Sequence, residues 1–236
     1  MGTFVLIHGS FHGGWCWQRV APLLRQADHE VYTPTLTGLG ERKHLVTPQV
    51  GLELHIQDII NTLEFEDLHA VVLVGHSYAG FVIEGVAERL PKRVARLVFL
   101  DAFIPHDGQS AFDLMPGMEE EWTQFATLQG GAKVVPPMSP AALGITDPAD
   151  SAWVQSRLTP MPLLTHQQRI RLSSSQARKL PRTYILCTQF GFHDSAREAK
   201  SLGWDTYQLE TGHDAMLTVP RELAQTLNKA VAKTAQ

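Results

Sequence analysis

The chain has 236 residues, a length that fits one α/β domain and does not require a second one. Hydrophobic residues make up 44% and charged residues 19% of it, which is ordinary for a globular protein. The formal net charge of −4 gives no reason to expect nucleic acid or an anionic membrane as a partner.

Short β-rich apolar runs alternate with segments of helical period at the start and at the end of the chain. This alternation is typical of a parallel sheet with helices on both faces. It predicts strands at Phe4 to His8, Val31 to Thr33, Ala70 to Val74, Val94 to Leu100, Thr183 to Cys187 and Asp205 to Leu209. It predicts helices at Trp15 to Gln26, Leu52 to Leu63, Phe81 to Leu90, Ser195 to Leu202 and from about Arg221 onward.

The alternation is lost between about Pro105 and Pro181. Prolines interrupt this segment, but its many aromatic and methionine side chains argue against disorder. A stretch this long without regular elements is usually functional when it lies inside a domain. We interpret residues 105–180 as a helical cap, or lid, inserted between residues 1–104 and 181–236 of the core.

The two cysteines, Cys16 and Cys187, lie far apart in a chain without disulfide-rich character, so we expect reduced and mostly buried thiols. Met1 leads almost directly into a strand-like run, without the basic start and longer apolar stretch of a secretory signal. No apolar run approaches the roughly 20 residues that span a bilayer. These features predict a cytoplasmic protein with no membrane partner.

One motif carries the chemistry, the run from Gly75 to Gly80, which reads Gly-His-Ser-Tyr-Ala-Gly. It follows a predicted buried strand and leads into a predicted helix, the setting that a nucleophile elbow requires. Gly75 and Gly80 leave room for the tight turn, and the positive end of the helix favours a negative intermediate. The alternative is a chance match in an ordinary βα turn. The flanking elements favour Ser77 as a nucleophile.

The Gly-rich loop from His8 to Gly14 follows the first predicted strand and is expected to lie beside the elbow. In this architecture such a loop donates one backbone N–H to the developing oxyanion, and the residue after the nucleophile donates a second. We therefore predict an oxyanion hole made by the N–H groups of Ser10 and Tyr78.

A metal site and a dinucleotide-binding loop are both excluded by the spacing of residues along the chain. His8 and His12 could ligate a metal, but no carboxylate or cysteine lies at a fitting distance along the chain. The run Gly38-Leu39-Gly40 has Lys43 where a dinucleotide fingerprint needs its third glycine. We expect no cofactor and no metal.

His213 is the candidate base. It lies in the turn after the last predicted strand, where the chain order Ser, acid, His places the base. Of the 11 histidines it alone has that context, and the alternative is a surface histidine in a turn.

Several motifs together resemble one branch of the α/β-hydrolases, which holds the plant methylesterases, the plant hydroxynitrile lyases and related bacterial esterases. They are His-Gly-x-x-His-Gly from His8, Trp15-Cys16-Trp17, Gly75-His76-Ser77, Leu100 to Pro105 and Cys187-Thr188. The likeness covers the sheet along nearly the whole chain and is weak in the cap. It implies an α/β-hydrolase fold, with a mostly parallel sheet of about six strands, flanking helices and an inserted helical cap.

The chain departs from this branch at the residue expected to be the catalytic acid, the carboxylate that orients the histidine. In the plant members the acid follows the Cys-Thr pair by two residues, and Phe190 stands there in this chain. Asp101 ends the strand after the elbow helix, a position that some α/β-hydrolases use for their acid, although it could instead accept loop N–H groups. Asp194 is nearer the usual place but precedes a helical run, an ordinary N-cap position. The sequence favours Asp101 over Asp194.

These residues predict a serine hydrolase that cleaves a small aromatic or hydrophobic ester through an acyl-enzyme on Ser77, with carbamates and activated amides as alternatives. The expected partners are a small-molecule ester and, as an open alternative, a second copy of the chain. A ligand-binding receptor with little turnover is the rival from another class. A hydroxynitrile lyase is disfavoured because Asp214 stands where those enzymes carry a lysine, and a carboxylate would repel cyanide.

Aromatic side chains suggest where the substrate binds. Phe11, Phe103 and Trp153 are predicted to line an apolar pocket, together with Trp122 and Phe125. The alternative for each is packing of the cap on the core.

Overall fold

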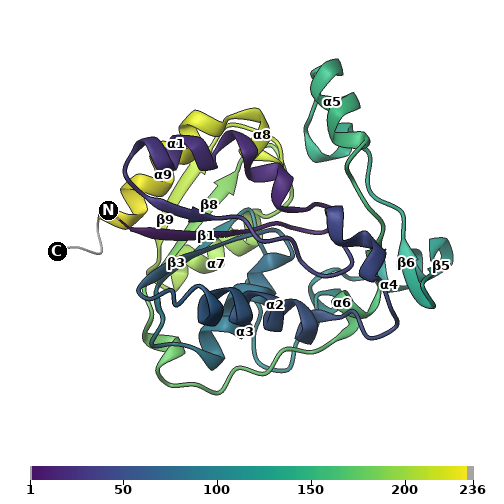
Figure 1. Ribbon diagram of the computed structural model, residues 1–236, viewed down its shortest axis with the longest axis horizontal. Coiled ribbons are helices and arrows are strands. Elements are labelled where there is room, and N and C mark those ends of the chain that lie inside the picture. Colours follow the sequence, from purple (N-terminus) through teal and green to yellow (C-terminus); the bar gives the residue numbers. More distant parts are fainter. Residues whose placement is uncertain (1, 233–236) are drawn as a thin grey trace.

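Six strands form the central sheet of the computed structural model, which describes residues 2–232. Its strand pairs are parallel and their order is β2-β1-β3-β4-β8-β9. The strands are β1 (Thr3–Ile7), β2 (Glu30–Tyr32), β3 (Val71–His76), β4 (Val94–Leu100), β8 (Arg182–Cys187) and β9 (Asp205–Leu209). The predicted parallel sheet is confirmed (Figure 1).

Helices cover both faces of this sheet. Because side chains alternate along a strand, Phe4 and Leu6 of β1 enter one hydrophobic core and Val5 and Ile7 enter the other. Burial on both faces explains why the central strands are nearly continuous apolar runs. The first core is closed by α1 (Ala21–Gln26), α8 (Ala215–Thr218) and α9 (Pro220–Ala232), and the second by α2 (Leu52–Phe65), α3 (Ala79–Arg89) and α7 (His193–Ser201) (Figure 1).

Some helix boundaries differ from the predicted ones. The helix predicted over Trp15 to Gln26 is divided into the 3-10 helix η1 (Gly14–Arg19) and α1. Pro22 lies in the first turn of α1, where a missing N–H removes no helical hydrogen bond. The Gly38–Gly40 run leads only into a 3-10 helix, η2 (Gly40–Leu45).

Residues 105–180 contribute no strand to the six-stranded sheet. They contain a second sheet, of three antiparallel strands. The prediction of a helical cap did not include these strands, which are only two to four residues long. The elements of this segment are η3 (Phe112–Leu114), α4 (Met118–Phe125), β5 (Thr127–Gln129), β6 (Ala132–Val135), η4 (Pro140–Leu143), α5 (Pro148–Gln155), β7 (Met161–Pro162), α6 (Leu164–Gln167) and η5 (Ala177–Lys179). Figure 1 shows α4, α5, β5 and β6 of this segment beyond the carboxyl ends of the core strands.

Both cysteines are buried and free, as predicted. Among residues 2–232, none of the helices combines the length and apolar character needed to cross a membrane.

Candidate active site

Ser77 lies in a strained turn between β3 and α3. Its φ is 55°, in the left-handed region that a serine rarely adopts. Its N–H donates to the carbonyl oxygen of Leu100 at 3.2 Å, and its own carbonyl accepts from the N–H of Phe103 at 3.2 Å. A Cβ on Gly75 would lie 2.6 Å from the carbonyl oxygen of Ala79, so the turn requires glycine there. The local geometry is that of the predicted elbow.

His213 and Asp101 are in direct contact. Nδ1 of His213 lies 2.7 Å from Oδ2 of Asp101, and both side chains are buried. The other carboxylate oxygen, Oδ1, accepts the backbone N–H of Cys187 at 3.0 Å. The two roles considered for Asp101, partner of the histidine and acceptor of loop N–H groups, are therefore filled at once by its two oxygens.

Asp194 lies elsewhere. It is exposed and forms an ion pair with Arg197 on the same helix. Because α7 begins at His193, Asp194 lies in its first turn rather than at the N-cap, which is Phe192. There a carboxylate stabilises the positive end of the helix.

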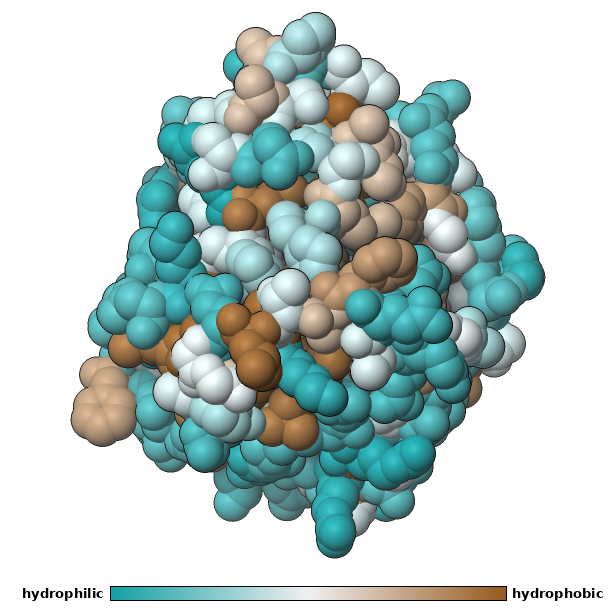
Figure 2. Space-filling model, turned by 90° about the vertical axis from the view of Figure 1, so that its right-hand side faces the viewer, coloured by the Kyte–Doolittle hydropathy of each residue, from teal (hydrophilic) through white to brown (hydrophobic). Residues whose placement is uncertain are grey.

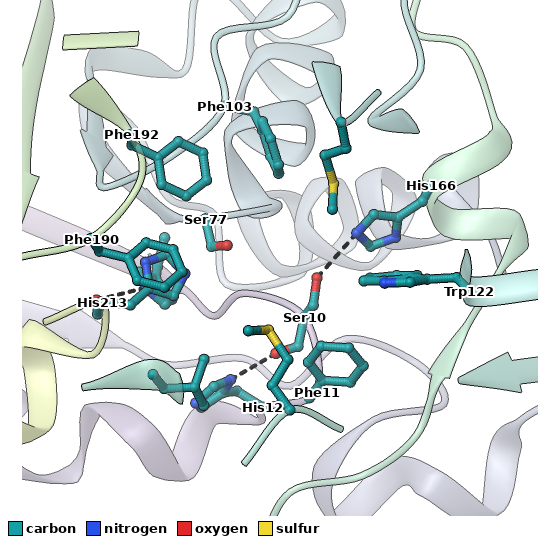
Figure 3. Close-up of a pocket in the computed structure, with 14 residues that line it drawn as sticks. Ser10, Phe11, His12, Ser77, Phe103, Trp122, His166, Phe190, Phe192 and His213 are labelled. Carbon is teal, nitrogen blue, oxygen red and sulfur yellow. Dashed lines mark hydrogen bonds between the residues drawn. The ribbon is translucent and has the colours of Figure 1, made fainter. Parts of the chain in front are cut away.

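Phe190, at the position where the resemblance to the plant enzymes implies an acid, covers the His213 ring. The two rings are stacked with centroids 4.1 Å apart and an interplanar angle of 22°. Phe192 is also stacked with His213, at 5.5 Å and 9°. Figure 3 shows both phenylalanines gathered with His213 on one side of Ser77. Aromatic packing thus holds the plane of the imidazole.

The loop after β1 lies against the elbow, as predicted. A Cβ on Gly9 would be only 2.8 Å from Cβ of Ser77. The next residue, Ser10, has its hydroxyl 3.2 Å from Nε2 of His166, a cap residue. Phe11 has a φ of 68°, so strain is present on this loop as well.

Tyr78 is fully buried and directly precedes α3. Its hydroxyl lies 3.2 Å from Nδ1 of His55, whose Nε2 lies 2.9 Å from the carbonyl oxygen of Thr37. His55 therefore donates through Nε2 and accepts the tyrosine proton at Nδ1. Burial lowers the pKa of His55 to about 4, which keeps it neutral.

A buried histidine–carboxylate pair links the loop after β1 to the residue after His213. Nε2 of His12 lies 3.0 Å from Oδ2 of Asp214, and Nδ1 of His12 donates to the carbonyl oxygen of Ser10 at 2.7 Å. Burial alone lowers the pKa of His12, but the Asp214 charge outweighs it and the pKa is raised. Burial alone raises the pKa of Asp214, but the His12 charge outweighs it and the pKa is lowered. Each group therefore favours the charged form of the other.

The position of Asp214 does not support the expectation that its carboxylate would repel cyanide at the reaction centre. Its side chain is fully buried beside His12 and does not line the cavity at Ser77. His76 also joins this group, with Nε2 3.1 Å from the carbonyl oxygen of His213. The sequence offered one overlooked signal, a carboxylate directly followed by the apolar run from Ala215 to Leu217.

A cavity of about 100 Å³ opens beside Ser77 under the cap. Phe11 and Phe103 line it, as predicted, and so does Trp122 (Figure 3). The remaining lining residues are Ser10, His12, His76, Ser77, Met115, Met138, Leu143, His166, Phe190, Phe192 and His213.

Trp153 does not line this cavity, contrary to the prediction. Its ring lies edge-on to Trp15, and the guanidinium groups of Arg19 and Arg157 lie over it. Phe125 is 62% exposed on the cap. Figure 2 shows the cap side of the molecule, where hydrophobic side chains form small groups among hydrophilic ones.

His166 was not singled out from the sequence, where it stands among polar residues of the cap. It is 1% exposed, and burial lowers its pKa to about 3. Over residues 2–232 there is no group of three or more histidine, cysteine, aspartate or glutamate side chains placed to hold a metal ion.

Comparison with known proteins agrees with this fold. Residues 4–226 match the model of the Alpha/beta hydrolase family. A carbendazim hydrolyzing esterase of Nocardioides sp. (strain SG-4G) is 39% identical over 96% of this chain and 98% of its own. Salicylic acid-binding protein 2 of Nicotiana tabacum is 29% identical over 79% of this chain and 78% of its own.

Among solved structures, an extracellular alpha/beta-hydrolase from a Paenibacillus species superimposes with a TM-score of 0.85. It is 27% identical, and the match covers 98% of this chain and 99% of that one. That protein shares structural and functional homology with tobacco Salicylic Acid Binding Protein 2.

Proposed function

Since the chain belongs to the alpha/beta hydrolase family and its relatives include esterases, we propose that it hydrolyses a small aromatic or hydrophobic carboxylic ester through an acyl-enzyme on Ser77. His213 takes the proton of Ser77 as the hydroxyl attacks the ester carbonyl. His213 then returns the proton to the leaving alcohol, and a water molecule repeats the sequence to release the acid.

The observation that carries this proposal is the contact between Asp101 and His213. A carboxylate on Nδ1 leaves Nε2 free to act as the base and stabilises the charged imidazole during attack. His213 and Ser77 line the same cavity, so the base and the nucleophile share access to one substrate.

The oxyanion is held by the backbone N–H groups of Ser10 and Tyr78. Gly9 lies against Ser77, which brings the Ser10 loop to the elbow, and Tyr78 follows Ser77 directly. Loss of one such donor costs on the order of 3 kcal/mol in the activation barrier.

The substrate class follows from the lining. Phe11, Phe103 and Trp122 suit a flat apolar group, and methyl or other small alkyl esters fit the limited volume. The Nocardioides relative hydrolyses carbendazim, and the tobacco relative binds salicylic acid. Carbamates and activated amides use the same acyl-transfer groups and belong to the same proposal.

Hydrolysis of p-nitrophenyl acetate tests the nucleophile. The wild-type protein should release p-nitrophenol in a burst followed by a steady rate, and Ser77→Ala should show neither. Ser201→Ala, which removes an exposed hydroxyl on α7, is the matched control and should behave as the wild type. Equal rates for the wild type and Ser77→Ala would remove Ser77 as the nucleophile and would favour a receptor with little turnover.

A further inference from the structure

His166 has no part in the proposed acyl transfer, yet it is one of the most constrained groups at the cavity. It belongs to α6 in the cap and is 1% exposed. Its ring is stacked with Tyr78 at 4.8 Å and 20°, and Trp122 contacts it with a centroid separation of 4.8 Å. These contacts hold the imidazole at the wall of the cavity.

The tautomer of His166 follows from its neighbour Thr165. The Thr165 hydroxyl oxygen is 2.6 Å from the carbonyl oxygen of Pro162, and two oxygens at that distance require a proton between them. Thr165 therefore donates to Pro162, and its oxygen accepts the N–H at Nδ1 of His166 at 2.8 Å. Burial holds the pKa of His166 near 3, so the ring is neutral and Nε2 bears a lone pair.

That lone pair accepts a hydrogen bond from the Ser10 hydroxyl. Ser10 Oγ lies 3.2 Å from Nε2, and because Nε2 carries no proton the hydroxyl must be the donor. Figure 3 shows this hydrogen bond crossing one end of the lined cavity. A hydroxyl rotates freely, so an incoming donor group can take its place on Nε2 without moving the ring.

We infer that His166 Nε2 accepts a hydrogen bond from the acyl part of the substrate, so that the site favours acyl groups carrying an N–H or O–H donor. The inference rests on the proposed function, which decides whether the acyl group or the alcohol of the ester lies beside His166. His213 returns a proton to the leaving alcohol, so the alcohol lies beside His213. Figure 3 shows His213 and His166 on opposite sides of Ser77, which leaves the His166 side for the acyl group.

The preference for ligands with a donor arises because a buried acceptor, Nε2 of His166, is costly to leave without a hydrogen bond. A ligand without a donor that displaces Ser10 leaves a buried ring nitrogen without a partner, whereas a ligand with a donor replaces one hydrogen bond by another. Two classes of acyl group meet the requirement, carbamates with an N–H on the carbonyl carbon and esters of hydroxy acids.

Binding to Ser77→Ala tests this without turnover. Three ligands of similar shape serve as probes: methyl phenylacetate without a donor, methyl N-phenylcarbamate with an N–H, and methyl mandelate with an O–H. By titration calorimetry at least one of the two donor ligands should bind about tenfold more tightly than methyl phenylacetate. Adding His166→Leu should abolish that preference, and adding His166→Gln, which restores an acceptor, should recover part of it.

Ser10→Ala in the Ser77→Ala background is the matched control. It removes the competing hydroxyl and keeps the backbone N–H, so the preference should persist or increase. Equal affinity for all three ligands, no measurable binding of any, or a preference that survives His166→Leu would overturn the inference. If the preference is present while the wild type hydrolyses none of the three, only the proposed function fails. If hydrolysis occurs without any preference, only this inference fails.

Discussion

Oδ2 of Asp101 lies 2.7 Å from Nδ1 of His213, although β8 separates the strands that the two residues follow. The carboxylate is held at its other oxygen by the N–H of Cys187. Phe190, where the resemblance to the plant enzymes implies an acid, instead stacks on the imidazole. The carboxylate that contacts His213 therefore follows β4, and the ring stacked on His213 follows β8.

Asp101→Asn is expected to lower kcat for p-nitrophenyl acetate by about 10³ to 10⁴, because an amide cannot stabilise the charged His213. Asp194→Asn, on exposed α7, is the matched control and should leave kcat unchanged. Circular dichroism of both variants checks that they fold. The opposite ranking would transfer the role to Asp194.

Phe190→Ala is expected to reduce kcat/KM on the order of tenfold, because the imidazole loses the ring that holds its plane. Phe125→Ala removes an equally large side chain that is 62% exposed on the cap and should have no effect. The measurement is steady-state hydrolysis of p-nitrophenyl acetate. Unchanged kinetics of Phe190→Ala would show that Phe190 is not needed to position His213.

The His12–Asp214 pair predicts a pH-dependent contribution to stability. The pKa of His12 is raised above 6.5 in the folded protein, so its contribution is fully present below pH 6.5 and is lost as the pH rises through the folded value. The pKa of Asp214 is lowered below 3.8, so its contribution is present above pH 3.8 and is lost as the pH falls through the folded value. Both contributions coincide between pH 3.8 and 6.5.

Asp214→Asn should therefore lower the free energy of unfolding most within this window, by about 3–5 kcal/mol, and by less as the pH rises. Urea unfolding of the wild type and the variant from pH 5 to pH 9 measures the difference. Asp67→Asn, which removes an exposed carboxylate beside Arg93, is the control and should change stability little. A difference for Asp214→Asn that does not vary with pH would contradict a charged His12.

Gly212 lies in the turn that carries His213 and packs against Gly144 of the cap. A Cβ on Gly212 would lie 2.6 Å from Cα of Gly144, a backbone atom that cannot move aside cheaply. Gly212→Ala should cost about 1–3 kcal/mol of stability and should lower turnover, because the adjacent His213 is displaced. Gly191→Ala is the control, since a Cβ there meets nothing within 4 Å. Thermal unfolding and esterase assays of both variants test the prediction, and similar behaviour of the two would refute it.

The sequence by itself was sufficient to predict the parallel sheet, the family and the elbow at Ser77. These features depend on residues close together in the chain. A buried parallel strand is an apolar run whatever its neighbours are, and the tightness of a βα turn is decided by the small residues within it, here Gly75 and Gly80.

Only the tertiary structure decided which side chains form hydrogen bonds with the histidines. Asp101 reaches His213 because β8 pairs with both β4 and β9, and pairing between strands leaves no signal in local pattern. The same holds for His12 with Asp214 and for Ser10 with His166, which join segments more than a hundred residues apart. Trp153 was misplaced for this reason too, because an aromatic residue in a cap has no local feature that distinguishes a cavity wall from packing against Trp15.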